Sequence, residues 1–257
     1  MPLKSITSRD NPVYREILAL ATDRRARRQA GKTVLDGLHL LDSALATGVM
    51  PERLVISEPA YQGPLAEWLE RLPDVPTLVL PEPLFAGLSP VDTPQGLLAV
   101  IALPQPDDGE AESVVLLENI QDPGNLGALV RVAAAAGVAA VCLSRGCAEA
   151  WSPKCLRGGQ GAHFQVAIHE GVDLPDFARG FAGTIHAASL AATESLYTLD
   201  LRGRVGLAFG NEGAGLSAEL CAAARPFRIP MPGRVESLNV ATAAAVCLFE
   251  RVRQLES

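Results

Sequence analysis

Apolar and polar residues alternate along the first hundred residues in a way that predicts a small α/β domain. Apolar residues at helical spacing predict helices at Ile17–Ala21, Leu38–Ala46 and Leu65–Leu72. Short apolar runs bounded by Pro, Gly or polar residues predict strands at Val34–Leu35, Leu54–Ile56, Thr77–Leu80 and Leu97–Ala102. No internal repeat accompanies this alternation.

A segment rich in Pro, Gly and acidic residues, 104–112, interrupts the pattern and predicts a boundary between two domains, 1–103 and 113–257. After it, a buried-strand run at Val114–Leu117 is followed by a helical stretch at Leu126–Ala136 and a strand at Val138–Leu143. This order predicts a parallel α/β sheet, in which ligands bind at the carboxyl ends of the strands. The later elements are strands at Phe164–Ile168, Thr184–Ala188, Val205–Phe209 and Phe227–Pro230, and a helix from Asn239 to about Leu255.

The length and composition agree with two globular domains. With 257 residues, 48% hydrophobic and 20% charged, the chain has room for two hydrophobic cores. No apolar run approaches the roughly 18 residues that span a bilayer, and residues 1–10 lack the apolar core of a signal peptide. We therefore expect no membrane partner and a cytoplasmic location.

The cysteines predict neither disulfides nor a metal site. They form an odd, widely spaced set without a CxxC pair: Cys142, Cys147, Cys155, Cys221 and Cys247. Such spacing argues against both a disulfide framework and a zinc site, so we expect no bound metal. The cysteines are interpreted as small apolar residues.

The net charge of −7 is unevenly distributed along the chain. Residues 1–32 contain eight Lys or Arg against three acids, a net charge of +5 that leaves −12 for the rest. Within them lies a dense cluster of arginines: Arg24, Arg25, Arg27 and Arg28. These side chains can neutralise RNA phosphates without reading sequence, although a solvated helix face would have the same composition.

Three segments join a predicted strand to a helix and are dense in Gly, Pro, Asn and acidic residues. They are Glu118–Arg131, Phe209–Ser217 and Ile229–Ala243. Glycines allow a ligand to approach the backbone, whose free amides can bind adenosine or phosphate. The second segment has the glycine pattern GxxGxG rather than GxGxxG, and no P-loop occurs, so NAD and ATP sites lose their main support.

In order and spacing, the three segments resemble the three motifs of the SpoU (TrmH) family of RNA ribose methyltransferases in the SPOUT superfamily. The matching positions are Asn125, Gly127 and Arg131; Gly210, Glu212, Gly213 and Gly215; and Pro230, Met231, Ser237, Leu238 and Asn239. The N-terminal part is similar to the L30e-like substrate-binding domain often attached in this family. The resemblance implies a C-terminal α/β domain with a trefoil knot, a rare exception to the rules of chain connection, and a homodimer formed through it.

The resemblance also implies the chemistry. A methyl group would pass from S-adenosyl-L-methionine to a ribose 2′-hydroxyl, a displacement that requires both partners to be held close and aligned. The implied cofactor-binding positions are Ala188, Gly210, Ile229 and Leu238, and the implied catalytic positions are Asn125, Arg131, Glu212, Ser237 and Asn239. Because arginine stays protonated, Arg131 would act either as a base in an unusual environment or by holding phosphate or alkoxide charge.

The sequence leaves several alternatives open. Ribosomal RNA is the first choice of substrate, because a dedicated N-terminal module suits a structured target, and transfer RNA is the second. A catalytically silent RNA-binding assembly factor would share the fold, but the intact positions at Asn125, Arg131, Glu212 and Asn239 argue against it. Taken singly, Ser237 and Asn239 also fit simple caps of the last helix.

Overall fold

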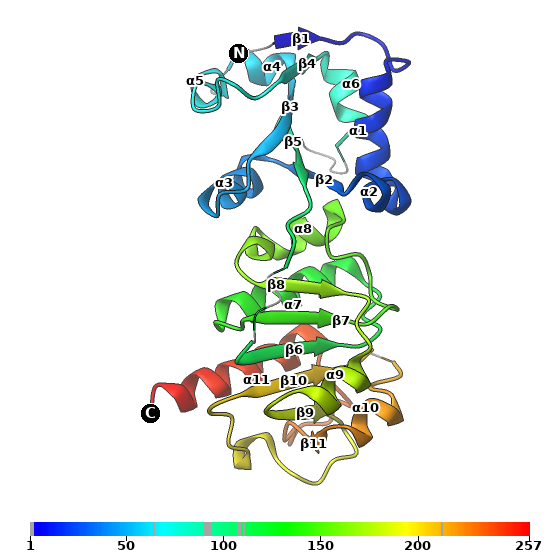
Figure 1. The fold of residues 1–257 in the computed structure, drawn as a ribbon. Helices are drawn as coiled ribbons and strands as arrows, with labels where there is room; N and C mark the ends of the chain where they lie inside the picture. Colours follow the sequence, from blue (N-terminus) through cyan, green and yellow to red (C-terminus); the bar gives the residue numbers. More distant parts are fainter. Residues whose placement is uncertain (1–2, 64, 90–93, 107–108, 110, 212) are drawn as a thin grey trace. The chain divides into compact units, whose positions relative to one another are not determined.

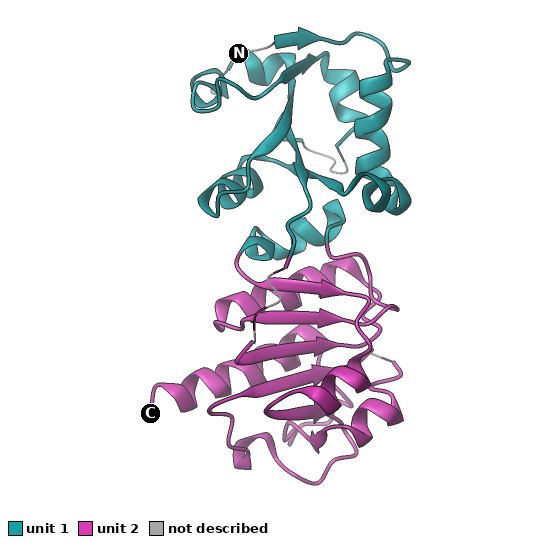
Figure 2. Ribbon diagram, viewed as in Figure 1, with its two compact units in different colours: residues 1–105, 151–164 teal, residues 106–150, 165–257 magenta. Residues whose placement is uncertain are grey.

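The computed structural model describes residues 3–63, 65–89, 94–106, 109, 111–211 and 213–257. Two compact units divide the chain: residues 1–105 with 151–164, and residues 106–150 with 165–257 (Figure 2). The sequence prediction assigned 151–164 to the second domain, whereas the structure groups this segment with the first unit. A contact distant in sequence contributes to the difference, because the buried Thr33 hydroxyl donates to the Trp151 carbonyl oxygen at 2.6 Å.

The first unit is built on a five-stranded mixed sheet with the order β1-β4-β3-β5-β2 (Figure 1). The strands are β1 (Leu3–Ser5), β2 (Lys32–Asp36), β3 (Pro51–Ser57), β4 (Thr77–Leu80) and β5 (Leu97–Ala102). The helices are α1 (Pro12–Thr22), α2 (Arg24–Ala30), α3 (Leu38–Ala46), α4 (Glu58–Tyr61), α5 (Leu65–Leu69), α6 (Glu82–Ala86) and α8 (Pro153–Gly159), followed by the 3₁₀ turn η1 (Ala162–Phe164). The predicted small α/β domain is confirmed.

Local signals determine where the first two helices begin. The Asn11 side chain accepts a hydrogen bond from the Val13 backbone amide at 2.9 Å and caps α1. Asp23 then ends α1, and its side chain accepts from the Arg25 amide at 2.8 Å to start α2. The arginine-rich segment is therefore a separate short helix that changes direction at Asp23.

The second unit contains a six-stranded sheet in which every pair of neighbours is parallel, with the order β11-β9-β10-β6-β7-β8. The strands are β6 (Ser113–Leu117), β7 (Ala140–Leu143), β8 (Ala167–Glu170), β9 (Thr184–Ala188), β10 (Val205–Phe209) and β11 (Arg225–Phe227). The helices are α7 (Pro123–Ala135), α9 (Leu174–Gly180), α10 (Ala218–Ala222) and α11 (Val240–Leu255), with the 3₁₀ turn η2 (Leu196–Thr198). The predicted parallel α/β sheet is confirmed.

Helices cover both faces of this sheet, with α9 and α10 in front of it in Figure 1 and α7 and α11 behind it. On the first face, Leu116 of β6 and Ala208 of β10 pack with Leu174 of α9 and Leu220 of α10. All five residues of β6 and all five of β10 are buried. Burial on both faces explains why these strands are continuous apolar runs in the sequence.

The connection between β9 and β10, residues 189–204, is bonded at two places along its length. The Arg228 amide, just after β11, donates to the Glu194 carbonyl, and the Leu196 amide donates back to the Arg228 carbonyl, both at 2.8 Å. Near the end of α11, the Gln254 side chain accepts from the Leu201 amide and donates to the Leu199 carbonyl. The connection is therefore attached both to the chain that follows β11 and to the last helix.

Two predicted strands are displaced. The strand predicted at Phe164–Ile168 begins only at Ala167, because residues 162–164 form the turn η1 in the first unit. The strand predicted at Phe227–Pro230 is instead the edge strand Arg225–Phe227, of which only Phe227 is buried. Within the described residues, no helix is both long and apolar enough to cross a membrane.

Candidate functional site

Three loops at the carboxyl edge of the parallel sheet form the candidate site. The first follows β6 and ends where the Asp122 side chain caps α7. The second follows β10 and ends where Ser217 caps α10, and the third follows β11 and ends where Asn239 caps α11. Each of the three segments singled out in the sequence thus joins a strand of this sheet to a helix.

A cavity of about 370 Å³ lies among the second and third loops and the end of β9. Its lining includes all four positions predicted to bind the cofactor: Ala188, Gly210, Ile229 and Leu238. Apolar side chains of Phe209, Leu216, Met231 and Val240 contribute to the wall. The size lies in the usual range for small-molecule sites, roughly 300–1,000 Å³, and the mixture of backbone and apolar groups suits a largely apolar, flat ligand.

The second loop has a compact shape that the Asn211 side chain maintains. Its Oδ1 accepts hydrogen bonds from the amides of Gly213 at 2.9 Å and Ala214 at 3.1 Å. The Gly215 amide donates to the Asn211 carbonyl at 2.8 Å, and Gly215 has a φ of 69°. At Gly210 the backbone approaches so closely that an added Cβ would lie 2.3 Å from the carbonyl carbon of Gly215.

Two of the predicted catalytic residues are in direct contact. The Asn239 side-chain amide donates to Asn125 Oδ1 at 3.0 Å and so joins the first loop to the third. Asn239 Oδ1 accepts from the amides of Ala241 and Thr242, which makes it the cap of α11. Ser237 lines the cavity nearby. Asn239 is therefore both a helix cap and part of the candidate site.

Arg131 lies apart from this pair within one chain. It is exposed on α7, six residues after Asn125, or about 9 Å along the helix axis. Among the residues that the structure describes, no carboxylate lies within ion-pair distance of its guanidinium. Glu212, the remaining predicted catalytic residue, lies outside the described residues.

The four arginines predicted to bind RNA differ in exposure. Arg24, Arg25 and Arg28 are exposed on α2. Arg27 is only 4% exposed, and its guanidinium donates to the Leu20 carbonyl at 2.7 Å. Arg27 is therefore a structural residue that joins α2 to α1, and its prediction as an RNA-binding residue is withdrawn.

Several polar residues of the site were not predicted from the sequence. Glu118 and Asn119 follow β6 directly, and both are bonded to the second loop, at Ser217 and Asn211 respectively. The signal for Asn211 was present, because an Asn two residues before a Gly favours a turn in which its side chain binds the following amides. No comparable sequence signal indicates that Glu118 is buried.

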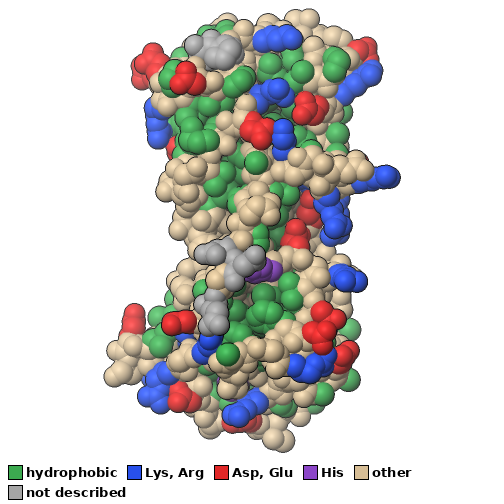
Figure 3. Space-filling view, in the orientation of Figure 1, with side chains coloured by type: hydrophobic (Ala, Val, Ile, Leu, Met, Phe, Trp, Pro, Cys, Tyr) green, Lys and Arg blue, Asp and Glu red, His purple; other side chains and the backbone are tan. Residues whose placement is uncertain are grey.

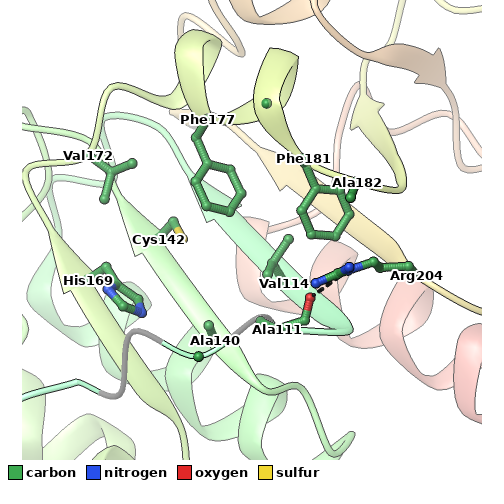
Figure 4. Close-up of a pocket in the computed structure, with 12 residues that line it drawn as sticks. Ala111, Val114, Ala140, Cys142, His169, Val172, Phe177, Phe181, Ala182 and Arg204 are labelled. Atoms are coloured by element: carbon green, nitrogen blue, oxygen red, sulfur yellow. Dashed lines mark hydrogen bonds between the residues drawn. The ribbon is translucent and has the colours of Figure 1, made fainter.

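A second cavity, of about 440 Å³, lies on the α9 face of the sheet and has different chemistry (Figure 4). Small residues of β6 and β7 form its floor, Phe177 of α9 and Phe181 just after that helix flank it, and Arg204 donates to the Ala111 carbonyl at its rim. Hydrophobic side chains gather in a hollow in the lower part of Figure 3, over the second unit. None of the residues predicted to be functional lines this second cavity.

The cysteines and the possible metal ligands add no further chemistry. All five cysteines are free, and burial raises the pKa of the Cys142 and Cys247 thiols to about 12. These thiols therefore stay protonated at neutral pH and lack the thiolate that nucleophilic chemistry requires. In the described part of the chain, no cluster of three or more His, Cys, Asp or Glu could hold a metal ion.

Two known families match the chain, one for each half. The SpoU rRNA Methylase family matches residues 112–249, and the MRM3-like substrate binding domain matches residues 3–99. The first match contains all three loops of the candidate site.

Individual relatives and solved structures agree with these matches. The chain is 31% identical over 252 residues to the 23S rRNA (guanosine(2553)-2'-O)-methyltransferase RlmP of Bacillus subtilis, covering 96% of this chain and 98% of that protein. The AdoMet-bound rRNA methyltransferase from Sinorhizobium meliloti superposes with a TM-score of 0.85 at 30% identity, covering 99% of both chains. The SpoU methyltransferase AviRb from Streptomyces viridochromogenes, in complex with AdoMet, gives a TM-score of 0.87 at 26% identity over 96% of this chain and 99% of that one.

Gly210→Ala should distort the cavity without unfolding the protein. The added Cβ would overlap backbone atoms of Gly215 and Leu216, so the second loop must move. We expect the dissociation constant for S-adenosyl-L-methionine, the cofactor that the sequence resemblance implies, to rise about tenfold or more, equivalent to about 1.4 kcal/mol. Isothermal titration calorimetry would measure it. Gly180→Ala, where an added Cβ meets nothing within 4 Å, is the matched control, and equal affinities of the two variants would contradict the prediction.

Proposed function

The chain belongs to the SpoU rRNA Methylase family, and on that basis we propose that it methylates a ribose 2′-hydroxyl of ribosomal RNA, with S-adenosyl-L-methionine as methyl donor. The observation that carries the proposal is the cavity at the carboxyl edge of the sheet, which Ala188, Gly210, Ile229 and Leu238 line together. Ribosomal RNA is favoured over transfer RNA because RlmP, which matches nearly the whole chain, is named as an enzyme of 23S rRNA. A cytoplasmic location is part of the same proposal.

The cavity fits the proposed cofactor by its shape and its chemistry. Close packing at Gly210 leaves a cradle of backbone that any side chain would fill. Backbone groups of the two loops border the cavity and can bind an adenosine, and the apolar wall formed by Phe209, Met231 and Val240 suits its flat ring. When bound there, S-adenosyl-L-methionine would supply an activated methyl group on its sulfonium.

The protein's own contribution is to position and polarise the ribose. Asn125 and Asn239 are joined by a hydrogen bond, and Ser237 lines the cavity. An enzyme accelerates such a transfer mainly by holding the 2′-hydroxyl close to the methyl group and in line with it, so that the two groups need not meet by diffusion. Arg131 is assigned the electrostatic role, because holding phosphate or alkoxide charge is what a guanidinium does without any unusual environment. Glu212 is retained as a catalytic residue from the family motif.

Arg131→Ala is the experiment that tests the proposed reaction. The variant should fold and bind S-adenosyl-L-methionine with unchanged affinity, because Arg131 does not line the cavity. Methyl transfer to ribosomal RNA should fall by about 100-fold or more, the usual scale for removing a group that stabilises developing charge. Incorporation of a radiolabelled methyl group would measure the rate. Wild-type activity in this variant would remove Arg131 from the reaction, and a wild-type protein inactive on every ribosomal RNA fragment would refute the function.

The exposed arginines of α2 are assigned to RNA binding. Arg24, Arg25 and Arg28 lie close together on seven residues of helix and extend into solvent. Contacts of this kind with phosphates supply affinity that is independent of sequence and that weakens as salt is added.

Reversing these three charges, by Arg24→Glu, Arg25→Glu and Arg28→Glu together, should weaken RNA binding and flatten its salt dependence. We expect the slope of log K against log salt to fall by about 2, since each lost phosphate contact contributes about 0.7 to 0.9. Fluorescence anisotropy at several salt concentrations would measure it. Arg71→Glu removes an exposed arginine that pairs with Asp42 elsewhere in the same unit and serves as the control. An unchanged slope in the triple variant would exclude α2 from the RNA contact.

A homodimer formed through the second unit completes the proposal. Phe249 is 50% exposed and Leu255 is 51% exposed on α11, the helix that packs along α7. Large apolar side chains that are exposed on a helix can mark an interface. A two-fold axis would bury each copy of α11 against the same surface of its partner.

Phe249→Asp should convert the dimer into a monomer, because a carboxylate cannot be buried at an apolar interface without a partner. Sedimentation velocity at micromolar concentration would give the mass of both species. Met50→Asp places the same charge at an apolar residue that is 55% exposed in the first unit, and this control should leave the mass unchanged. A wild-type protein that sediments as a monomer would disprove the dimer.

A further inference from the structure

Glu118 is a buried carboxylate that is bonded to the second loop and that has none of the catalytic roles assigned above. It follows β6 directly and is only 7% exposed. Its Oε2 accepts a hydrogen bond from the Ser217 amide at 2.6 Å, and its Oε1 accepts from the Ser217 hydroxyl at 2.7 Å. One residue of the second loop therefore binds both oxygens of the carboxylate.

Burying a carboxylate is unfavourable unless hydrogen bonds compensate for the lost water. Both bonds to Glu118 come from Ser217, the residue that follows the cavity-lining stretch Gly213–Leu216. The carboxylate is therefore stabilised only when the end of this loop lies in its present position. The Ser217 hydroxyl also accepts from the Leu220 amide at 3.2 Å and caps α10. Displacing the end of the loop would leave the carboxylate without partners and α10 without its cap.

The start of the same loop is bound to the neighbouring residue. The Asn211 side-chain amide donates to the Asn119 carbonyl at 3.0 Å. Asn119 has a φ of 54°, and its amide donates to the Ser144 hydroxyl at 3.0 Å, so its backbone is fixed in a left-handed conformation. The two ends of the second loop, at Asn211 and Ser217, are thus held by two consecutive residues of the first loop.

We propose that Glu118 is a positioning residue that keeps the loop from Gly210 to Ser217 in the shape that binds S-adenosyl-L-methionine. The inference rests on the proposed function, since it assigns that cofactor to the cavity. Both carboxylate oxygens are bound to Ser217, so Glu118 acts through this loop and not on the substrate. The first motif then has two tasks, because Asn125 contacts Asn239 while Glu118 shapes the cofactor loop.

The test compares Glu118→Ala, Glu118→Gln and Ser217→Ala by isothermal titration with S-adenosyl-L-methionine. Glu118→Ala should raise the dissociation constant about tenfold or more, the scale for losing hydrogen bonds to a buried charge. Glu118→Gln should recover part of this loss, because its amide oxygen can accept from the Ser217 amide while its NH₂ donates to the hydroxyl. Ser217→Ala should weaken binding less in the Glu118→Ala background than in the wild type, which would show that the two residues act as one unit.

A kinetic measurement separates positioning from a general loss of stability. In Glu118→Gln, the KM for S-adenosyl-L-methionine should rise while kcat at saturation stays within about twofold of the wild type. Glu149→Gln removes another carboxylate that is 7% exposed in the same unit, and it should leave the dissociation constant unchanged. Should Glu118→Ala fail to fold, Glu118→Gln and Ser217→Ala still decide the question.

The outcomes distinguish this inference from the proposed function. A wild type that binds the cofactor, together with Glu118 and Ser217 variants that bind it equally well, would overturn the positioning role and leave the function intact. If Glu149→Gln weakened cofactor binding as much as Glu118→Gln does, this would also overturn the positioning role, because the loss of any buried carboxylate would then have the same effect. A wild type without measurable cofactor binding would refute both.

Discussion

The parallel pairing of β6 with β10 is the constraint on which the rest of the site depends. The register aligns Leu117 with Phe209, and the Glu118 amide continues the ladder by donating to the Phe209 carbonyl at 2.9 Å. The two strands therefore end at the same level, and the loops that follow them begin side by side. The hydrogen bond from Asn211 to Asn119 and the bonds from Ser217 to Glu118 both require that the two loops begin at the same level. The sheet determines the site by aligning the ends of its strands.

Charge places a second constraint on how RNA could approach the second unit. Several of its arginines are already bound to carboxylates on the surface: Arg179 to Asp176 and Glu219, Arg202 to Asp200, and Arg253 to Glu250. The last pair lowers the pKa of the Glu250 carboxyl to about 2, so both groups remain charged over the physiological range. Acidic residues therefore neutralise much of the positive charge in this unit. This distribution agrees with the proposal that the basic N-terminal region attracts the phosphates while the C-terminal unit performs the chemistry.

The parts of the fold that the sequence predicted are those where one short-range rule is sufficient. Strands buried on both faces are continuous apolar runs, and loops that bind ligands are rich in Gly and Asn, so the central strands and three site loops were found. Elements at the edge of the sheet were predicted less well. Arg225 of β11 extends into solvent, so this strand is not an apolar run. Phe164 belongs to a turn and contacts Trp151, with ring centroids 5.9 Å apart. The four arginines of α2 look equivalent in the sequence, and only the turn at Asp23 buries Arg27. The burial of Glu118 likewise depends on Ser217, 99 residues away.

The order of the elements along the chain also has a consequence for synthesis on the ribosome. The strands β6 and β7 emerge early, but β10, which covers one side of β6, lies at residues 205–209, and the cavity wall reaches Ala243. At roughly 5–20 residues per second, on the order of ten seconds pass between the translation of Leu117 and that of Ala243. For most of this interval, until residue 209 has been translated, β6 lacks its neighbour β10. One edge of β6 is thus expected to stay exposed on the nascent chain until β10 has been made, and the cavity is complete only after the start of the last helix has followed.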